Sequence, residues 1–103
     1  MKIYKITELA YNSVEGYFAD AYFCKENYLH DFLENIKEGL IDFLTNRYKC
    51  ERKEVEKEIE ITKSSDVMVV RYGERFEWVY QWEDLEDDYI EAMKAVFADD
   101  IVS

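Results

Sequence analysis

Two groups of carboxylates are spaced regularly enough to form binding surfaces. Residues 54–60 carry a glutamate at every second position, and the stretch that begins at Asp84 carries acids at spacings of 0, 3, 4 and 7. Alternation by two places side chains on one face of a strand, whereas spacings of three and four place them on one face of a helix. Rows of carboxylates can form ion pairs with arginine and lysine side chains. The predicted partner-binding residues are Glu54, Glu56, Glu58, Glu60, Asp84, Asp87, Asp88 and Glu91.

Three other side chains could carry covalent or acid–base chemistry: His30, Cys24 and Cys50. A general base needs a partner within hydrogen-bond reach, and the sequence places neither a serine nor a cysteine beside His30. Two cysteines are too few for a disulfide scaffold and too far apart for a zinc motif, so both are expected to be reduced and partly buried. We predict that the chain is not an enzyme and has no catalytic residues, with a small enzyme using one of these three groups as an alternative.

No cofactor or metal site is expected. Residues 83–88 lack both the ligand spacing and the central glycine of a calcium loop. The three glycines, Gly16, Gly39 and Gly73, form no phosphate-binding pattern.

The net charge of the 103-residue chain is −11. Nucleic acids and anionic membranes require basic patches, so neither is expected to bind directly, and the expected partner is a basic protein. Residues 83–103 hold eight acids and one base, whereas the first 82 residues hold sixteen acids and twelve bases. A fifth of the chain therefore carries most of the imbalance.

Ordinary helix chemistry could explain part of the acidic stretch after Glu83. The helix macrodipole stabilises acids in a first turn by ~0.3–1 kcal/mol each, which could account for Asp84, Glu86, Asp87 and Asp88. Glu91 lies beyond that turn. Asp99 and Asp100 lie at the other end, where the dipole disfavours anions. A functional anionic surface is the prediction, with a merely solvated surface as the alternative.

Length and composition predict a single domain over residues 1–103. The chain is 49% hydrophobic and 17% aromatic, enough for one core. No apolar run approaches the ~18 residues that span a bilayer. The alternation from Met1 to Ile6 indicates a strand rather than a signal peptide. A cytoplasmic protein is expected, including the cytoplasm of a bacterial host, as a monomer or a homodimer.

The N-terminal half predicts a hairpin followed by a long helix. Residues Lys2 to Glu8 and Tyr17 to Phe23 are expected to be paired strands, joined by turn residues between Leu9 and Gly16. Apolar residues at steps of three and four predict a helix from Tyr28 to Tyr48, with Asn27 as its N-cap. Gly39 lies inside this helix, where we expect a close backbone approach or a local bend.

The second half predicts a three-stranded meander followed by another helix. Its strands are expected at 54–61, 67–70 and 76–82, and the last carries Phe76, Trp78, Tyr80 and Trp82 on one face. Val55 and Ile59 also fit helical spacing, so a continuation of the long helix through 51–60 is the alternative. A final acidic helix is expected from Leu85 to Ala98, capped by Asp84. The predicted fold is α+β, with an antiparallel sheet of about four to five strands packed on one long helix.

In layout and charge, the chain resembles the small acidic proteins with which phages block bacterial defence, the anti-CRISPR and other DNA-mimic inhibitors. The features that carry the resemblance are the Glu54 to Glu60 row and the Asp84 to Glu91 stripe on a compact α+β frame. The resemblance implies that carboxylates occupy the basic nucleic-acid groove of a nuclease or CRISPR effector in place of phosphates. Inhibition would then be competitive and not catalytic. An immunity protein or antitoxin that covers a basic toxin nuclease rests on the same charge argument, and the gene's neighbours would distinguish the two.

Overall fold

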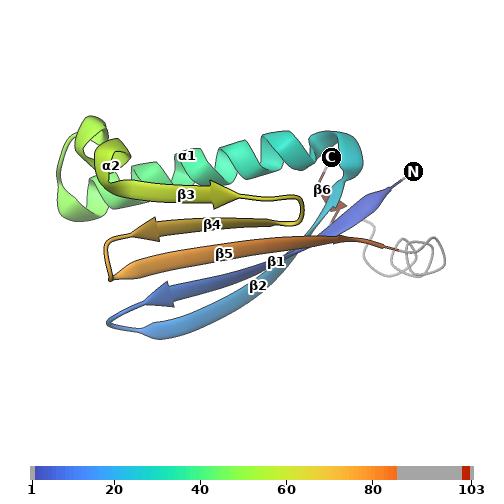
Figure 1. The fold of residues 1–103 in the computed structure, drawn as a ribbon, viewed down its shortest axis with the longest axis horizontal. Helices are drawn as coiled ribbons and strands as arrows, with labels where there is room; N and C mark the ends of the chain where they lie inside the picture. The colour runs from blue at the N-terminus through green and yellow to red at the C-terminus, as the bar shows by residue number, and fades with distance from the viewer. Residues whose placement is uncertain (1, 86–100, 103) are drawn as a thin grey trace.

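The computed structural model describes residues 2–85 and 101–102 and has the expected α+β fold (Figure 1). A strand hairpin comes first, then two helices, then three more long or medium strands and a short terminal one. In chain order the elements are β1 (Ile3–Asn12), β2 (Gly16–Lys25), the 3-10 turn η1 (Glu26–Tyr28), α1 (Leu29–Tyr48), α2 (Arg52–Glu58), β3 (Ile59–Lys63), β4 (Val67–Tyr72), β5 (Phe76–Asp84) and β6 (Ile101–Val102). Apart from Leu85, the helix predicted from Leu85 to Ala98 lies outside the described residues.

The strands form one sheet in the order β3-β4-β5-β1-β2-β6. Its five longer strands pair antiparallel, and β6 pairs parallel with Phe23 and Cys24 of β2. The predicted hairpin of the first two strands is confirmed, but both strands are longer than expected. They pair from Ile3 opposite Lys25 to Asn12 opposite Gly16, which confines the turn to three residues.

Two hairpin tips meet at one end of the sheet. Gly16 at the start of β2 and Gly73 in the β4–β5 turn have φ angles of 91° and 59°, in the region that residues with a Cβ rarely adopt. The Ser13 N–H donates to the carbonyl oxygen of Arg75 at 3.0 Å. This bond holds the two tips together near the C-terminal half of α1.

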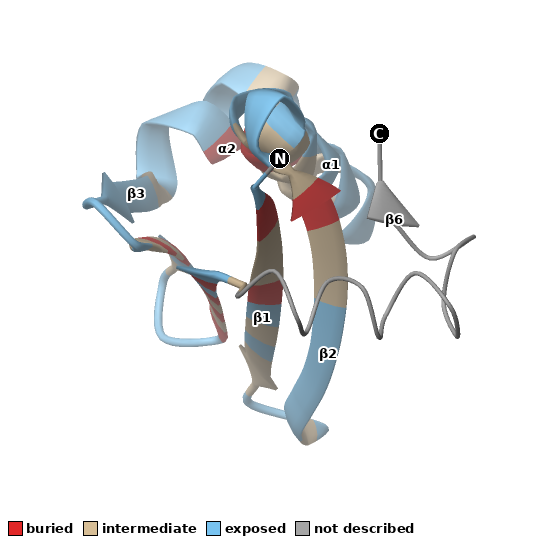
Figure 2. Ribbon diagram, turned by 90° about the vertical axis from the view of Figure 1, so that its right-hand side faces the viewer, coloured by how far each residue is buried: buried red, intermediate tan, exposed pale blue. Residues whose placement is uncertain are grey.

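Helix α1 covers one face of the sheet, and the hydrophobic core cluster lies on that face (Figure 2). Leu33, Ile41 and Leu44 of α1 are buried. The prediction that the aromatic side chains of β5 share one face is confirmed, because alternate residues of this strand are buried. These residues are Phe76, Trp78, Tyr80 and Trp82.

Asn27 does not cap α1, so that prediction is wrong. Residues 26–28 form a 3-10 turn, the N-cap position is Tyr28, and no side chain bonds to the first turn. The Glu26 N–H donates to the carbonyl oxygen of Lys2 at 3.0 Å. This bond fixes the exit of β2 against the start of β1, and the helix begins two residues after Asn27.

Replacing Gly39 with alanine is expected to stabilise the fold. Apart from the adjacent residues and the backbone of the helix itself, no heavy atom lies within 4 Å of where a Cβ at this position would be. The predicted close backbone approach is therefore absent. Alanine is favoured over glycine in a helix interior by roughly 0.5–1 kcal/mol. Urea denaturation should show a gain of about that size, and an unchanged or lower free energy of unfolding would contradict it.

The strand predicted for residues 54–61 is wrong over its first half. Residues 52–58 form α2, and β3 begins only at Ile59. The alternative of one continuous helix is also wrong, because Lys49 ends α1 in the left-handed conformation with φ of 51°. Its N–H donates to the carbonyl oxygen of Thr45. A short separate helix results.

Contacts with α1 explain why this segment is helical. Val55 is completely buried in the core, while the flanking glutamates are exposed. Arg52 bonds Glu56 one turn later and reaches Asp42 and Glu38 on α1. The helical form therefore buries its one apolar residue and places its arginine between two helices.

Candidate functional site

The four glutamates between residues 54 and 60 do not form one row. Glu54 and Glu58 lie one helical turn apart on α2, and Glu56 points about 160° away from Glu58 around the helix. Glu60 lies on β3 opposite Arg71. The predicted ladder of like charges on one strand face is therefore absent.

Helix α2 carries equal numbers of acidic and basic side chains. Its three glutamates are matched by Arg52, Lys53 and Lys57. The Arg52 guanidinium bonds Asp42 Oδ1 at 2.7 Å and Glu56 Oε1 at 2.9 Å, and it contacts Glu38. This surface joins α1 to α2, and its acids are partly neutralised within the chain.

The second predicted stripe is described only at its start. Asp84 is the last residue of β5, and its Oδ2 lies 3.8 Å from Lys2 Nζ. Asp87, Asp88 and Glu91 lie outside the described residues, so the stripe stays a prediction. Residues 86–100 carry six acids and one base, against eighteen acids and twelve bases in residues 2–85. The shorter segment has the higher density of negative charge.

The fold brings together two carboxylates that sequence reasoning did not single out. Glu8 on β1 lies directly opposite Asp20 on β2. The hydroxyl of Tyr22 lies 3.5 Å from Glu8 Oε1 and 3.4 Å from Asp20 Oδ2. Burial and these two carboxylates raise the pKa of Tyr22, and burial and Glu8 raise the pKa of Tyr80. Like charges directly opposite in a sheet are destabilising, and the tyrosine hydroxyls offset part of this cost.

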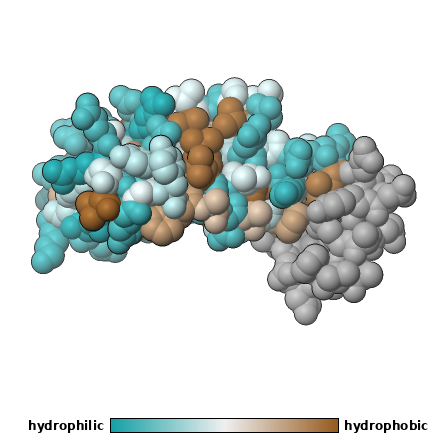
Figure 3. All heavy atoms as spheres, turned by 90° about the horizontal axis from the view of Figure 1, so that it is seen from below, coloured by the Kyte–Doolittle hydropathy of each residue, from teal (hydrophilic) through white to brown (hydrophobic). Residues whose placement is uncertain are grey.

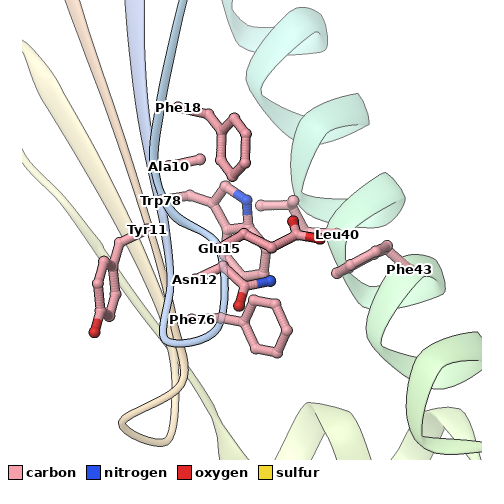
Figure 4. A pocket seen from close by; sticks show the side chains of 9 residues that line it. All are labelled: Ala10, Tyr11, Asn12, Glu15, Phe18, Leu40, Phe43, Phe76 and Trp78. Atoms are coloured by element: carbon pink, nitrogen blue, oxygen red, sulfur yellow. The ribbon is translucent and has the colours of Figure 1, made fainter.

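An apolar hollow of about 370 Å³ opens beside this pair, between the β1–β2 hairpin and α1 (Figure 4). We call it the aromatic groove. The Phe76 and Trp78 rings are stacked at 5.4 Å, and the Phe43 ring meets both edge-on at 5.8 and 6.2 Å. The apolar lining comes from Ala10, Phe18, Leu40, Phe43, Phe76 and Trp78.

Charged residues surround the aromatic groove unevenly. Glu15 lines it from the β1–β2 turn, and the neutral Asn12 lines it from the end of β1. Glu8 lies two residues before Ala10 on β1, and Asp20 lies two residues after Phe18 on β2. Both acids therefore lie on the same face of the sheet as the groove. Among the described residues, neither Glu8, Glu15 nor Asp20 forms an ion pair.

At its other end the groove borders a cation. The Arg47 guanidinium lies 5.3 Å from the centre of the Phe76 ring, within the range of a cation–π contact. Arg47 and Arg75 line an adjoining hollow that shares Phe76. The groove therefore borders Arg47 and Arg75 at the hairpin tips and lies next to Glu8 and Asp20 further from the tips, while Glu15 lines it from the β1–β2 turn.

The opposite face of the sheet is also partly apolar. Register places Val69, Val79, Leu9 and Ala19 side by side across four strands. Figure 3 shows this face, with hydrophobic atoms gathered in the middle of the molecule. Leu9 is 44% exposed. Within residues 2–85 no helix covers this row.

The candidate catalytic side chains show no activated arrangement. His30 is exposed on α1, Cys24 is buried in β2, and Cys50 is half-buried after α1. Cys24 Sγ lies 3.1 Å from the carbonyl oxygen of Lys25, and burial raises the pKa of its thiol. A reactive cysteine needs the opposite shift. In residues 2–85 no three histidine, cysteine or acidic side chains cluster as metal ligands would.

The two thiols are expected to differ in reactivity. Burial and a raised pKa both lower the thiolate concentration of Cys24, so iodoacetamide should modify Cys50 first in the folded protein. Mass spectrometry of timed samples would show the order. Equal rates in urea provide the control, and faster labelling of Cys24 in the native protein would contradict the assignment.

No helix among the described residues has the length and apolar character needed to cross a membrane. Comparison with protein-family models, curated proteins and solved structures finds no match for this chain.

Proposed function

We propose that the chain is an acidic inhibitor that binds a basic protein and occupies its nucleic-acid-binding surface. The proposed partner is a nuclease or a CRISPR effector, and inhibition is by competition with nucleic acid. The observation that carries this proposal is a set of three carboxylates, Glu8, Glu15 and Asp20, that form no ion pair within the described part of the chain. They lie beside a groove in which the Phe18 and Phe43 rings are exposed.

The distribution of charge supports a basic partner. A net charge of −11 creates a negative potential that attracts basic surfaces from beyond contact distance. The acids of residues 86–100 contribute strongly to this potential, whereas α2 contributes little because its charges balance. Acids steer the encounter, and exposed aromatics such as Phe18 supply contact area.

The proposal is tested with a panel of purified CRISPR effector complexes and toxin nucleases. Binding of labelled DNA is measured by fluorescence anisotropy with and without the protein. We expect the protein to weaken DNA binding by at least one enzyme, and excess DNA should relieve the effect, since both ligands share a surface. Inhibition confined to toxin nucleases would instead identify an immunity protein. Inhibition that excess DNA leaves unchanged, or no inhibition across the panel, would contradict the proposal.

A further inference from the structure

The aromatic groove has the composition of a site for a flat cation. Aromatic ring faces carry partial negative charge and attract cations, most strongly when the cation is removed from water. Phe18 and Phe43 are 53% and 43% exposed, which is unusual for side chains of this size beside a packed core. Both rings are therefore accessible to solvent beside the stacked Phe76–Trp78 pair.

Carboxylates lie at or beside the aromatic groove, where they can pair with the charge of such a cation. Glu15 lines the groove itself. Asp20 follows Phe18 by two residues on the same strand face, which places their side chains about 7 Å apart. No described base pairs with either acid. An incoming cation therefore finds both aromatic faces and carboxylate oxygens within the span of one side chain.

The position of Arg47 assigns the end at which the cation binds. Its guanidinium lies over Phe76, so a second cation is repelled from that end of the groove. Phe18 and Trp78 lie toward Glu8 and Asp20. The occupied Phe76 ring also shows that this group of aromatic residues accommodates a guanidinium.

From these observations we infer that the aromatic groove binds an arginine side chain of a basic partner protein. Its apolar stem contacts Ala10 and Leu40, its guanidinium stacks against the exposed Phe18 ring beside Trp78, and its N–H groups donate to Glu15 or Asp20. Arginine fits better than lysine because the guanidinium is flat, weakly hydrated and able to donate two parallel bonds to a carboxylate. The partner is taken to be basic on the strength of the proposed function.

The test uses two probes of nearly equal shape and different charge. N-acetyl-arginine methylamide is cationic, and the citrulline analogue is neutral. Titrations are followed by the indole N–H resonance of Trp78, assigned with the Trp78→Phe variant. We expect the arginine probe to shift this resonance saturably, and the citrulline probe to bind at least about tenfold more weakly. Equal affinities for the two probes would overturn the assignment.

Two variants form a matched pair on neighbouring residues of β2. Phe18 faces the groove, and Tyr17, which is 71% exposed, faces the opposite side of the sheet. Phe18→Ser should abolish the arginine-dependent shift, and Tyr17→Ser should leave it unchanged. Glu15→Gln combined with Asp20→Asn should weaken arginine binding and leave citrulline binding unaltered. An effect of Tyr17→Ser as large as that of Phe18→Ser would contradict the groove.

The groove and the proposed function can fail separately. The probe titration needs no partner, so a probe that does not bind would remove the arginine site while inhibition in the DNA-binding panel persisted. Saturable arginine binding with no inhibition in the panel would instead leave the site and remove the proposed function.

Discussion

Reversing Asp87, Asp88 and Glu91 to lysine is expected to weaken binding to the partner by several kcal/mol, on the order of 2–5. The proposed partner is basic, so the change replaces attraction with repulsion at three positions of residues 86–100, a segment with six acids and one base. Isothermal titration with the nuclease or effector that the panel identifies would measure the loss. The melting temperature is expected to change little, because surface ion pairs contribute only about 0–1 kcal/mol to folding.

The matched control reverses Glu54, Glu56 and Glu58, which alters the net charge by the same six units. Long-range attraction falls equally in both variants, so any difference between them reports local contact. Helix α2 is electrically balanced, and Arg52 already holds Glu56. The control should therefore lose less affinity than the first variant. An equal loss would show that only total charge matters, and a larger loss would place the contact on α2.

Replacing Leu44 with alanine is expected to destabilise the fold by about 2–5 kcal/mol. Leu44 is completely buried between α1 and the sheet, so the change leaves a cavity where apolar contacts existed. A domain of this size has a total stability of about 5–15 kcal/mol, so the loss is a large fraction of it. Urea denaturation followed by circular dichroism would measure it.

Leu9 is the matched control, because it is the same residue type on the opposite face of the sheet. Its side chain is 44% exposed, so Leu9→Ala should cost less than about 1 kcal/mol. A cost for Leu9 comparable to that for Leu44 would mean that the uncovered face is packed in solution. Such a result would contradict the position of Leu9 outside the core cluster.

Long, strongly periodic elements could be predicted from the sequence. In α1, apolar residues recur at steps of three and four, and in β5 the aromatic side chains alternate over seven residues. Each pattern fits one kind of element only. The α+β class and the pairing of the first two strands follow from them.

Helix α2 could not be predicted in this way because two local patterns compete. Alternating glutamates indicate a strand, whereas Val55 and Ile59 have helical spacing. The deciding contacts are tertiary: Arg52 bonds Asp42 and Glu38, ten and fourteen residues earlier in the chain. No window of local sequence contains this information.

The acids beside the groove were missed for a related reason. Glu8 and Asp20 meet only in the register set by the three-residue turn between β1 and β2. A turn predicted at residues 13–15 would have placed these two acids opposite each other. The groove itself needs Phe18, Phe43 and Trp78 from three separate elements, so it appears only in the folded chain.

The dependence of partner binding on salt tests the central claim most directly. The Debye length falls from ~10 Å at 0.1 M to ~3 Å at 1 M salt, so electrostatic attraction between an acidic protein and a basic groove is screened over this range. Stopped-flow measurements across it should show an association rate constant that falls steeply and a dissociation constant that rises. Binding that is indifferent to salt, and equally indifferent to both charge reversals, would contradict occupation of a nucleic-acid-binding surface by carboxylates.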